Sequence, residues 1–167
     1  NNKISFVLWN GSSYVWQDVA AGFMPINQWA HVALTRNGTS IKVYVNGTSI
    51  ATYSITYAPG SNLGTNFYLG SISNATEQFS GSIDELKIWK TDRGSLIASD
   101  MNSNETSTSA LVGYWNFNEG SSSTAYNQVT TATAGTDFAL TASNYWNSIV
   151  VSSASTSGVY TTRTFYR

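Results

Sequence analysis

The chain of 167 residues contains no cysteine. No disulfide can therefore stabilise its fold. The absence of cysteine also excludes thiol nucleophiles and zinc sites with cysteine ligands. A chain of this length can bury a hydrophobic core that is stable without disulfide bonds. The lack of thiols does not identify a redox compartment, because only chains that have thiols are constrained by one.

Charged side chains are also scarce, at 10% of the residues, against roughly 25% in an average domain. The formal net charge is -1, and Lys and Arg form no cluster in the sequence. Binding to nucleic acids is driven by counterion release, which requires clustered Lys and Arg side chains that this chain lacks. The shortage of Lys and Arg also disfavours attachment to anionic membranes. We expect no nucleic-acid partner.

Long apolar runs are absent as well. None approaches the roughly 20 residues that a membrane-spanning helix requires, so we expect no membrane insertion. The sequence does not open with the charged and then apolar segment of a secretion signal. If the protein is exported, we expect this sequence to be a mature or truncated form.

Aromatic residues, by contrast, make up 14% of the chain, and enrichment in Trp, Tyr and Thr at low charge is typical of β-sheets. The first segment predicts a hairpin, with a strand at residues 3–9, a turn at Asn10-Gly11 and a second strand from residue 14 to 16. Many short strands between turns predict a sandwich or a barrel.

Residues 29–53 predict three antiparallel strands joined by two Asn-Gly turns. Residues 29–36 form a largely buried strand, and residues 41–45 alternate, with Ile41, Val43 and Val45 on one face. Residues 49–53 continue the meander. The two turns fix the register of all three strands.

The next apolar segments are residues 66–70 and 79–89, which we expect to be strands. In the second segment the apolar positions do not keep one parity, which predicts either a bulge near Asp84-Glu85 or burial on both faces. Residues 95–99 predict either a short helix with Ser95 as its N-cap or a loop.

A polar run at residues 102–110 reads as a linker or an exposed loop, and residues 111–117 after it predict a strong strand. Two later stretches, 149–151 and 159–167, are again β-prone. We therefore divide the chain into residues 1–101, a linker at 102–110, and a last segment at 111–167 that packs on the same sandwich or on a neighbour.

Three strings resemble the laminin-G-like jelly roll of the concanavalin-like superfamily. Residues 27–35 resemble its W-x-H-V-A-x-T strand, residues 41–47 its L-x-x-Y-V-D/N-G hairpin, and residues 79–89 its F-x-G-x-I-D-E-V-x-I-W/Y closing strand. The resemblance covers roughly residues 1–100. It implies an all-β fold, an antiparallel jelly-roll sandwich of two sheets.

The order of the strings departs from the family. Residues 111–121 resemble the strand with which its domains open, yet here this string follows the closing strand. The chain is then an incomplete fragment, a permuted version, or a sandwich with appended strands. In a fourth reading, partner chains complete each other by strand complementation, because a missing strand leaves a sheet edge that must be covered.

The sequence offers no catalytic machinery. Asp84 and Glu85 are the only adjacent carboxylates, and neighbours in a strand point to opposite faces, so they cannot converge on one bond. The Glu-x-Asp-x-x-Glu strand of the glucanases in the superfamily is absent. His31, the only histidine, has no nucleophile motif near it, and we expect it to be structural. We predict that the chain is not an enzyme.

Three aromatic residues near the first turn are candidate ligand-binding residues: Trp9, Tyr14 and Trp16. Exposed aromatic faces stack on sugar rings, whereas the same side chains serve equally as core residues of a sandwich. Both interpretations stay open for each of them. The positions of Trp29, Trp89 and Trp115 are core positions in the family.

The resemblance also implies a candidate metal site. In relatives, the Asp of the closing strand ligates a structural Ca²⁺ together with groups near the opening strand, which suits a cation that takes six to eight oxygens. Here these ligands are Asp84, Asn118 and Glu119, provided that the last segment pairs with the closing strand. Alternatively, Asp84 accepts backbone N–H bonds at a bulge and binds no metal.

From these observations we expect a non-catalytic module at an extracellular or cell-surface location that serves adhesion or structural assembly, as in a surface filament, a sheath or a multidomain stalk. The alternative is a carbohydrate-binding, lectin-like module of a secreted adhesin or enzyme. The expected partners are a glycan or a protein surface, and self-assembly by strand complementation.

Overall fold

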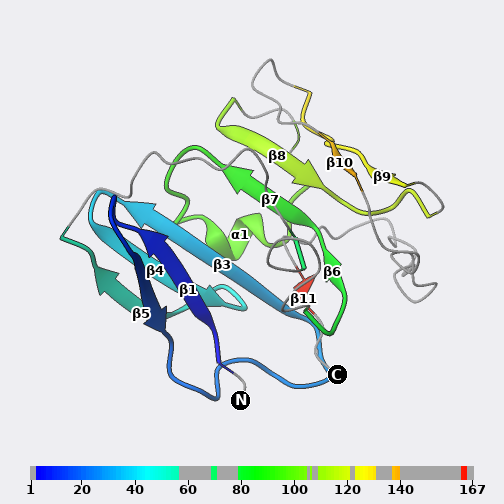
Figure 1. Ribbon diagram of the computed structural model, residues 1–167. Coiled ribbons are helices and arrows are strands. Elements are labelled where there is room, and N and C mark those ends of the chain that lie inside the picture. Colours follow the sequence, from blue (N-terminus) through cyan, green and yellow to red (C-terminus); the bar gives the residue numbers. More distant parts are fainter. Residues whose placement is uncertain are drawn as a thin grey trace.

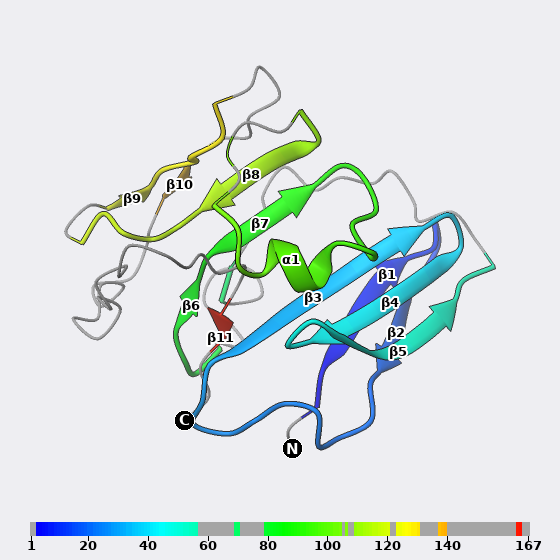
Figure 2. The same ribbon diagram turned by 180° about the vertical axis from the view of Figure 1, so that it is seen from behind.

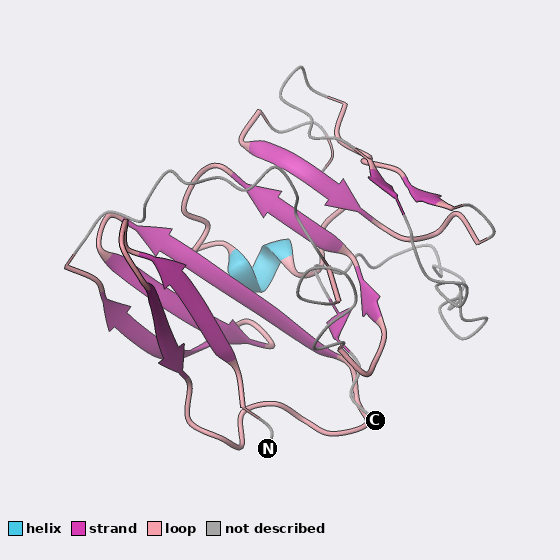
Figure 3. Ribbon diagram, in the orientation of Figure 1, coloured by secondary structure: helices cyan, strands magenta, loops and turns pink. Residues whose placement is uncertain are grey.

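The computed structural model describes residues 3–56, 69–70, 79–104, 106, 109–120, 123–130, 137–139 and 163–164. In these parts the chain consists of antiparallel strands with one short helix (Figures 1 and 3). The predicted all-β fold is confirmed. The strands predicted at residues 66–70 and 149–151 lie outside the described residues, apart from residues 69 and 70.

The three-stranded meander forms around the two predicted turns. β3 (Ala30–Asn37) pairs with β4 (Ser40–Val45), and β4 pairs with β5 (Thr48–Ser54). The register of β4 against β5 shifts between Val43 and Tyr44, which the turns did not predict. At the second turn Asn46 has φ 50° and Gly47 has φ 79°. Asn and Gly adopt this left-handed region at the lowest cost, which is why the pair makes a tight hairpin turn.

A hairpin of β1 (Ser5–Trp9) and β2 (Tyr14–Asp18) forms a second layer over the meander (Figure 1). The Phe6 ring packs edge to face on Tyr53 of β5, with 5.3 Å between the ring centroids. The Tyr53 hydroxyl donates a hydrogen bond of 2.8 Å to the backbone carbonyl of Asp18. These contacts join the two layers of the sandwich.

The described residues form two apolar clusters, one around Met24, Ala30 and Val45 and one around Leu111, Tyr114 and Val129. Ile41, Val43 and Val45 are buried on one face of β4, as their alternation predicts, and Val45 belongs to an apolar cluster with Met24 and Ala30. β3 is less buried than predicted, because Leu34 is 49% exposed. The prediction that residues 29–36 form a largely buried strand is therefore correct only for the first half of β3.

The helix α1 (Ile97–Asp100) lies between β3 and β7 in the view from behind (Figure 2). Its N-cap is Leu96 and no side chain caps it, so the prediction of Ser95 as N-cap is wrong. The turn is held instead by Arg93, whose guanidinium donates two hydrogen bonds of 2.8 Å to the Asp100 carboxylate.

The closing strand is interrupted as predicted. β6 (Ile83–Asp84) and β7 (Leu86–Trp89) are separated by Glu85, which has φ 57°. A left-handed residue inside a strand is a local irregularity that shifts the parity of the side chains after it. The irregularity predicted near Asp84-Glu85 is therefore present.

The last segment contributes strands next to the closing strand. β8 (Leu111–Trp115) pairs antiparallel with β7, and β9 (Thr124–Ala125) pairs with β10 (Phe138–Ala139). β11 (Arg163–Thr164) lies between β3 and β6 and pairs with both. Within the described residues, no helix has the length and apolar character needed to cross a membrane.

Candidate functional site

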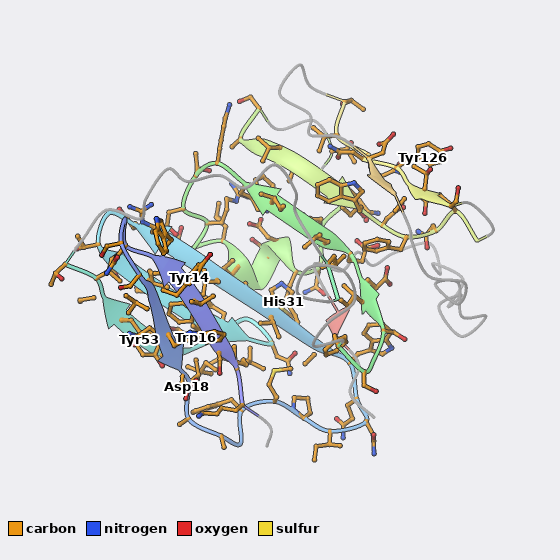
Figure 4. The ribbon with its side chains drawn as sticks, in the orientation of Figure 1. Tyr14, Trp16, Asp18, His31, Tyr53 and Tyr126 are labelled. Carbon is orange, nitrogen blue, oxygen red and sulfur yellow. The ribbon has the colours of Figure 1, made fainter. Side chains whose placement is uncertain are left out.

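The three predicted ligand-binding residues lie together on the outer face of the β1–β2 hairpin. In the register of this hairpin Trp9 is opposite Tyr14, and Val7 is opposite Trp16. Because side chains alternate along a strand, these four share the face that points away from the meander, and Phe6 points toward it. The side chains of Tyr14, Trp16 and Asp18 follow one another along β2 (Figure 4).

Two of the aromatic rings are open to solvent. Tyr14 is 69% exposed and Trp16 is 61% exposed, although both could have been buried in a sandwich of this composition. Trp9 is half-buried and packs edge to face on Tyr14, with 4.9 Å between the ring centroids. The structure therefore gives Trp9 a supporting contact and leaves the faces of Tyr14 and Trp16 accessible.

Polar groups border this aromatic surface at the end of the hairpin nearest the chain start. Asp18 lies opposite Ser5, whose hydroxyl donates a hydrogen bond of 2.6 Å to Oδ1, and Lys3 forms an ion pair with Oδ2. The hydrogen bonds from Lys3 and then from Ser5 lower the pKa of the Asp18 carboxyl. This end therefore offers a carboxylate, a hydroxyl and an ammonium group whose charges cancel.

The turn at the opposite end of the hairpin holds the aromatic residues in place. The side-chain oxygen of Asn10 accepts hydrogen bonds from the backbone N–H groups of Ser12, at 2.9 Å, and Ser13, at 2.8 Å. Gly11 has φ 101°, which a residue with a Cβ rarely adopts. This local network orders the chain just before Tyr14.

We call Ser5, Val7, Trp9, Tyr14, Trp16 and Asp18 the hairpin face. Val7, at 39% exposure, continues the apolar surface onto β1, where it lies opposite Trp16. A contiguous apolar patch with a polar border is typical of a site that binds a ligand or a partner. The sequence identified the aromatic members of the face, and it missed Ser5 and Asp18 because their pairing depends on the register.

His31 is buried, with 8% of its surface exposed. Burial lowers the pKa of its imidazole to about 4, and the nearby Lys87 acts in the same direction. Its Nδ1 atom is buried and has no hydrogen-bond partner among the residues that the structure describes. The side chain is therefore neutral at pH 7 and is sequestered from the hairpin face.

The two adjacent carboxylates accept hydrogen bonds from different donors. Glu85 is 7% exposed and accepts a hydrogen bond of 2.7 Å from the Tyr114 hydroxyl, while Asp84 accepts one of 3.0 Å from the backbone N–H of Glu85. Burial first, and then the contact with Glu85, raises the pKa of Tyr114. Glu85 thus joins β7 to β8 through a buried hydrogen bond.

The predicted calcium ligands come from two segments that the β7–β8 pairing brings to one end. Leu86 is opposite Trp115, so the residues before Leu86 and after Trp115 leave the ribbon on the same side. Glu119 Oε1 accepts a hydrogen bond of 2.7 Å from the backbone N–H of Tyr126. Its Oε2 is buried and has no hydrogen-bond partner in the described part of the chain.

An unpartnered buried carboxylate oxygen fits the ligand set of a hard cation. Asp84 already has the backbone hydrogen bond expected if it binds no metal, and Asn118 is exposed. Across the described ranges, no group of three or more His, Asp or Glu side chains is placed to hold a metal. The Ca²⁺ site therefore stays a prediction, with Glu119 as its best-supported member.

Comparison with known proteins identifies one family. A family model of the laminin-G type, described as the concanavalin A-like lectin/glucanases superfamily, matches residues 1–95. No curated protein and no solved structure matches the chain. The match spans β1 to β7 and so includes the whole hairpin face, and it confirms the resemblance carried by the three sequence strings.

Proposed function

Because the chain belongs to the concanavalin A-like lectin/glucanase superfamily, we propose that it is a non-catalytic adhesion module that binds glycans through its hairpin face. The observation that carries this proposal is the exposure of Tyr14 and Trp16 side by side on an ordered β2. The module acts at an extracellular or cell-surface location.

The chemistry of the hairpin face supports a sugar as the ligand. A pyranose ring presents C–H groups on its face and hydroxyls at its edge, and it therefore needs an aromatic surface beside polar groups. Tyr14 and Trp16 supply the aromatic surface, and Asp18 and Ser5 supply the polar groups. Since Lys3 neutralises Asp18, the face favours an uncharged sugar.

The same geometry supports the absence of catalysis. Hydrolysis of a glycosidic bond uses two carboxyl groups, roughly 5–9.5 Å apart, on either side of the bond. The hairpin face carries one carboxylate, Asp18, and it is engaged by Lys3 and Ser5. Glu85 is engaged by Tyr114 in the interior, and His31 is buried.

A glycan array tests the proposal. We expect saturable binding of neutral glycans by the wild-type protein and a loss of affinity of about 5- to 150-fold in Tyr14→Ala/Trp16→Ala, since each of the two aromatic contacts contributes about 0.5–1.5 kcal/mol. The matched control is Tyr126→Ala, which removes an aromatic side chain that is 50% exposed and lies outside the face.

The control should bind like the wild type, and far-ultraviolet circular dichroism should show the same fold in all three proteins. Unchanged glycan binding in the double variant, or equal loss in Tyr126→Ala, would contradict the assignment to the hairpin face. No binding to any glycan by the folded wild type would contradict the lectin-like function itself.

A further inference from the structure

The hairpin face is a strip of three residue pairs, each with one residue from β1 and one from β2. In order along the hairpin, the pairs are Trp9 with Tyr14, Val7 with Trp16, and Ser5 with Asp18. Successive pairs are two residues apart on each strand, and a strand rises roughly 3.4 Å per residue, so the pairs lie roughly 7 Å apart. The strip therefore measures roughly 14 Å from the first pair to the last.

This strip is open to solvent along its length. Tyr14 and Trp16 are 69% and 61% exposed, and the side chain of Asp18 is 51% exposed. None of the residues of the strip lines the groove of about 890 Å³ that lies between β3 and β7. A pocket for a small ligand encloses roughly 70–90% of the ligand's surface. Side chains that stand out from an open strand contact one side of a ligand, so a single sugar gains few contacts here.

The spacing of the two exposed rings matches linked sugars. Tyr14 and Trp16 follow one another along β2 (Figure 4), with their Cα atoms roughly 7 Å apart. Stacking requires that a sugar lie over the face of an aromatic ring in van der Waals contact. A pyranose ring is smaller than this separation, so one sugar covers one aromatic ring. Contact with both rings requires at least two linked sugars.

The first stacking position is pre-organised. Trp9 packs edge to face on the Tyr14 ring, with 4.9 Å between the ring centroids. The backbone just before Tyr14 is ordered by the hydrogen bonds that Asn10 accepts from Ser12 and Ser13. A side chain that is already held in place loses less conformational entropy when a ligand binds. Tyr14 is therefore a suitable anchor for the first sugar.

The third position can bond sugar hydroxyls. The Asp18 carboxylate accepts hydrogen bonds from the Ser5 hydroxyl and the Lys3 ammonium group. A carboxylate has about four acceptor sites and an ammonium group has several donors, so the described contacts leave capacity on both. Asp18 follows Trp16 at the same step of roughly 7 Å along β2. A third sugar, linked to the one on Trp16, reaches these groups.

We propose that the hairpin face binds an extended stretch of a linear neutral polysaccharide, with successive sugars at Tyr14, Trp16 and Asp18, and not a single terminal sugar. This inference rests on the glycan binding proposed above and names its ligand class. An open strip favours a ligand that gains contacts through its length, because each sugar is contacted on one side only. The ligand is neutral because Lys3 already balances the charge of Asp18.

Isothermal titration calorimetry with linear oligomers of glucose, mannose, xylose and galactose, from one to five sugars long, tests the proposal. In at least one series we expect the affinity to rise up to the trimer and then to level off, with a gain of about 2- to 12-fold for a sugar that stacks on an aromatic ring. A protein that binds glycans on the array but none of these series, or that binds a monosaccharide as tightly as its trimer, would overturn the inference and leave the proposed function standing. Absence of all glycan binding would overturn both.

Asp18→Ala tests the third position. The gain in affinity from dimer to trimer, at least about twofold in the wild type, should disappear in this variant. The matched control is Asp92→Ala, which removes an exposed carboxylate outside the hairpin face and should keep the gain. If circular dichroism shows that Asp18→Ala does not fold, Ser5→Ala probes the same position. Equal gains in the variant and in the control would overturn the assignment of a third sugar.

Discussion

At the scale of single residues, the environment of His31 converts a titratable group into a structural one. The imidazole is buried beside Lys87, and both effects disfavour its protonated form. Sequence alone predicted a structural histidine from the lack of a nucleophile motif. It could not predict the lowered pKa, because the burial arises from α1 and β7 packing near β3.

This environment predicts a pH dependence of stability. The unfolded chain binds a proton at His31 below pH 6.5, whereas the folded protein binds one only near pH 4. The free energy of unfolding should therefore be highest above pH 6.5 and fall as the pH drops toward 4, by up to about 3 kcal/mol. Urea unfolding at a series of pH values measures this, and His31→Gln should lose most of the slope between pH 6.5 and 4. An equal slope in the variant would assign the effect to other groups.

At the scale of elements, the turns of the meander show what local sequence determines. The alternation of β4 predicted the burial of Ile41, Val43 and Val45, and Asn46-Gly47 predicted the hairpin, but neither predicted the register shift between Val43 and Tyr44 in the β4–β5 pairing or the burial of Tyr44. Local sequence could not predict that Leu34 is exposed or that Arg93 replaces a helix cap. The exposure of Leu34 depends on how distant segments pack around β3, and the Arg93–Asp100 contact spans seven residues and depends on how the chain folds between them.

The second turn also packs against the helix, which gives a measurable difference between two glycines. A Cβ on Gly47 would lie 3.2 Å from Met101 Sδ and 3.4 Å from Ala98, whereas one on Gly38 would meet nothing within 4 Å. Both have positive φ, so Gly38→Ala should cost about 1–2 kcal/mol through backbone strain alone. Gly47→Ala should cost more. Equal midpoints of urea unfolding for the two variants would show that the turn does not press on α1.

The paired end of β7 and β8 carries the calcium prediction. If Glu119 Oε2 binds Ca²⁺, the ion should raise the melting temperature relative to a chelator, since an ion at a hundred times its Kd adds about 2.7 kcal/mol of stability. Glu119→Gln should abolish the rise, and Asp92→Asn, which changes a carboxylate that bonds only the nearby Gly94 N–H among the described contacts, should keep it. A wild-type melting temperature that is insensitive to Ca²⁺ would refute the site.

At the scale of the whole molecule, residues 111–117, which resemble the opening strand of the family but follow the closing strand in this sequence, lie beside the closing strand. This segment forms β8 and pairs antiparallel with β7, and the buried hydrogen bond between Tyr114 and Glu85 joins the two strands. The family resemblance predicted the strand, but its position in the sequence left several arrangements open. Pairing between distant segments had to be observed, because it is not encoded in the local pattern of either one.

The arrangement also separates two surfaces of the molecule. The hairpin face lies on the outside of one layer, and the groove lies between β3 and β7. The aromatic composition predicted candidates for the first surface. It did not predict the groove, because the groove depends on how β3 and β7, which are distant in the sequence, lie relative to each other.

The central claim is that the hairpin face binds the ligand, and NMR of the tryptophan indole N–H groups tests it most directly. The chain has six tryptophans, and Trp16 is 61% exposed on the hairpin face whereas Trp115 is 5% exposed in the interior. On titration with the neutral glycan that binds most tightly on the array, we predict that the signals of Trp16 and its neighbour Trp9 shift while that of Trp115 stays unchanged. Saturable shifts of other indole signals, with Trp16 and Trp9 unmoved, would contradict the account.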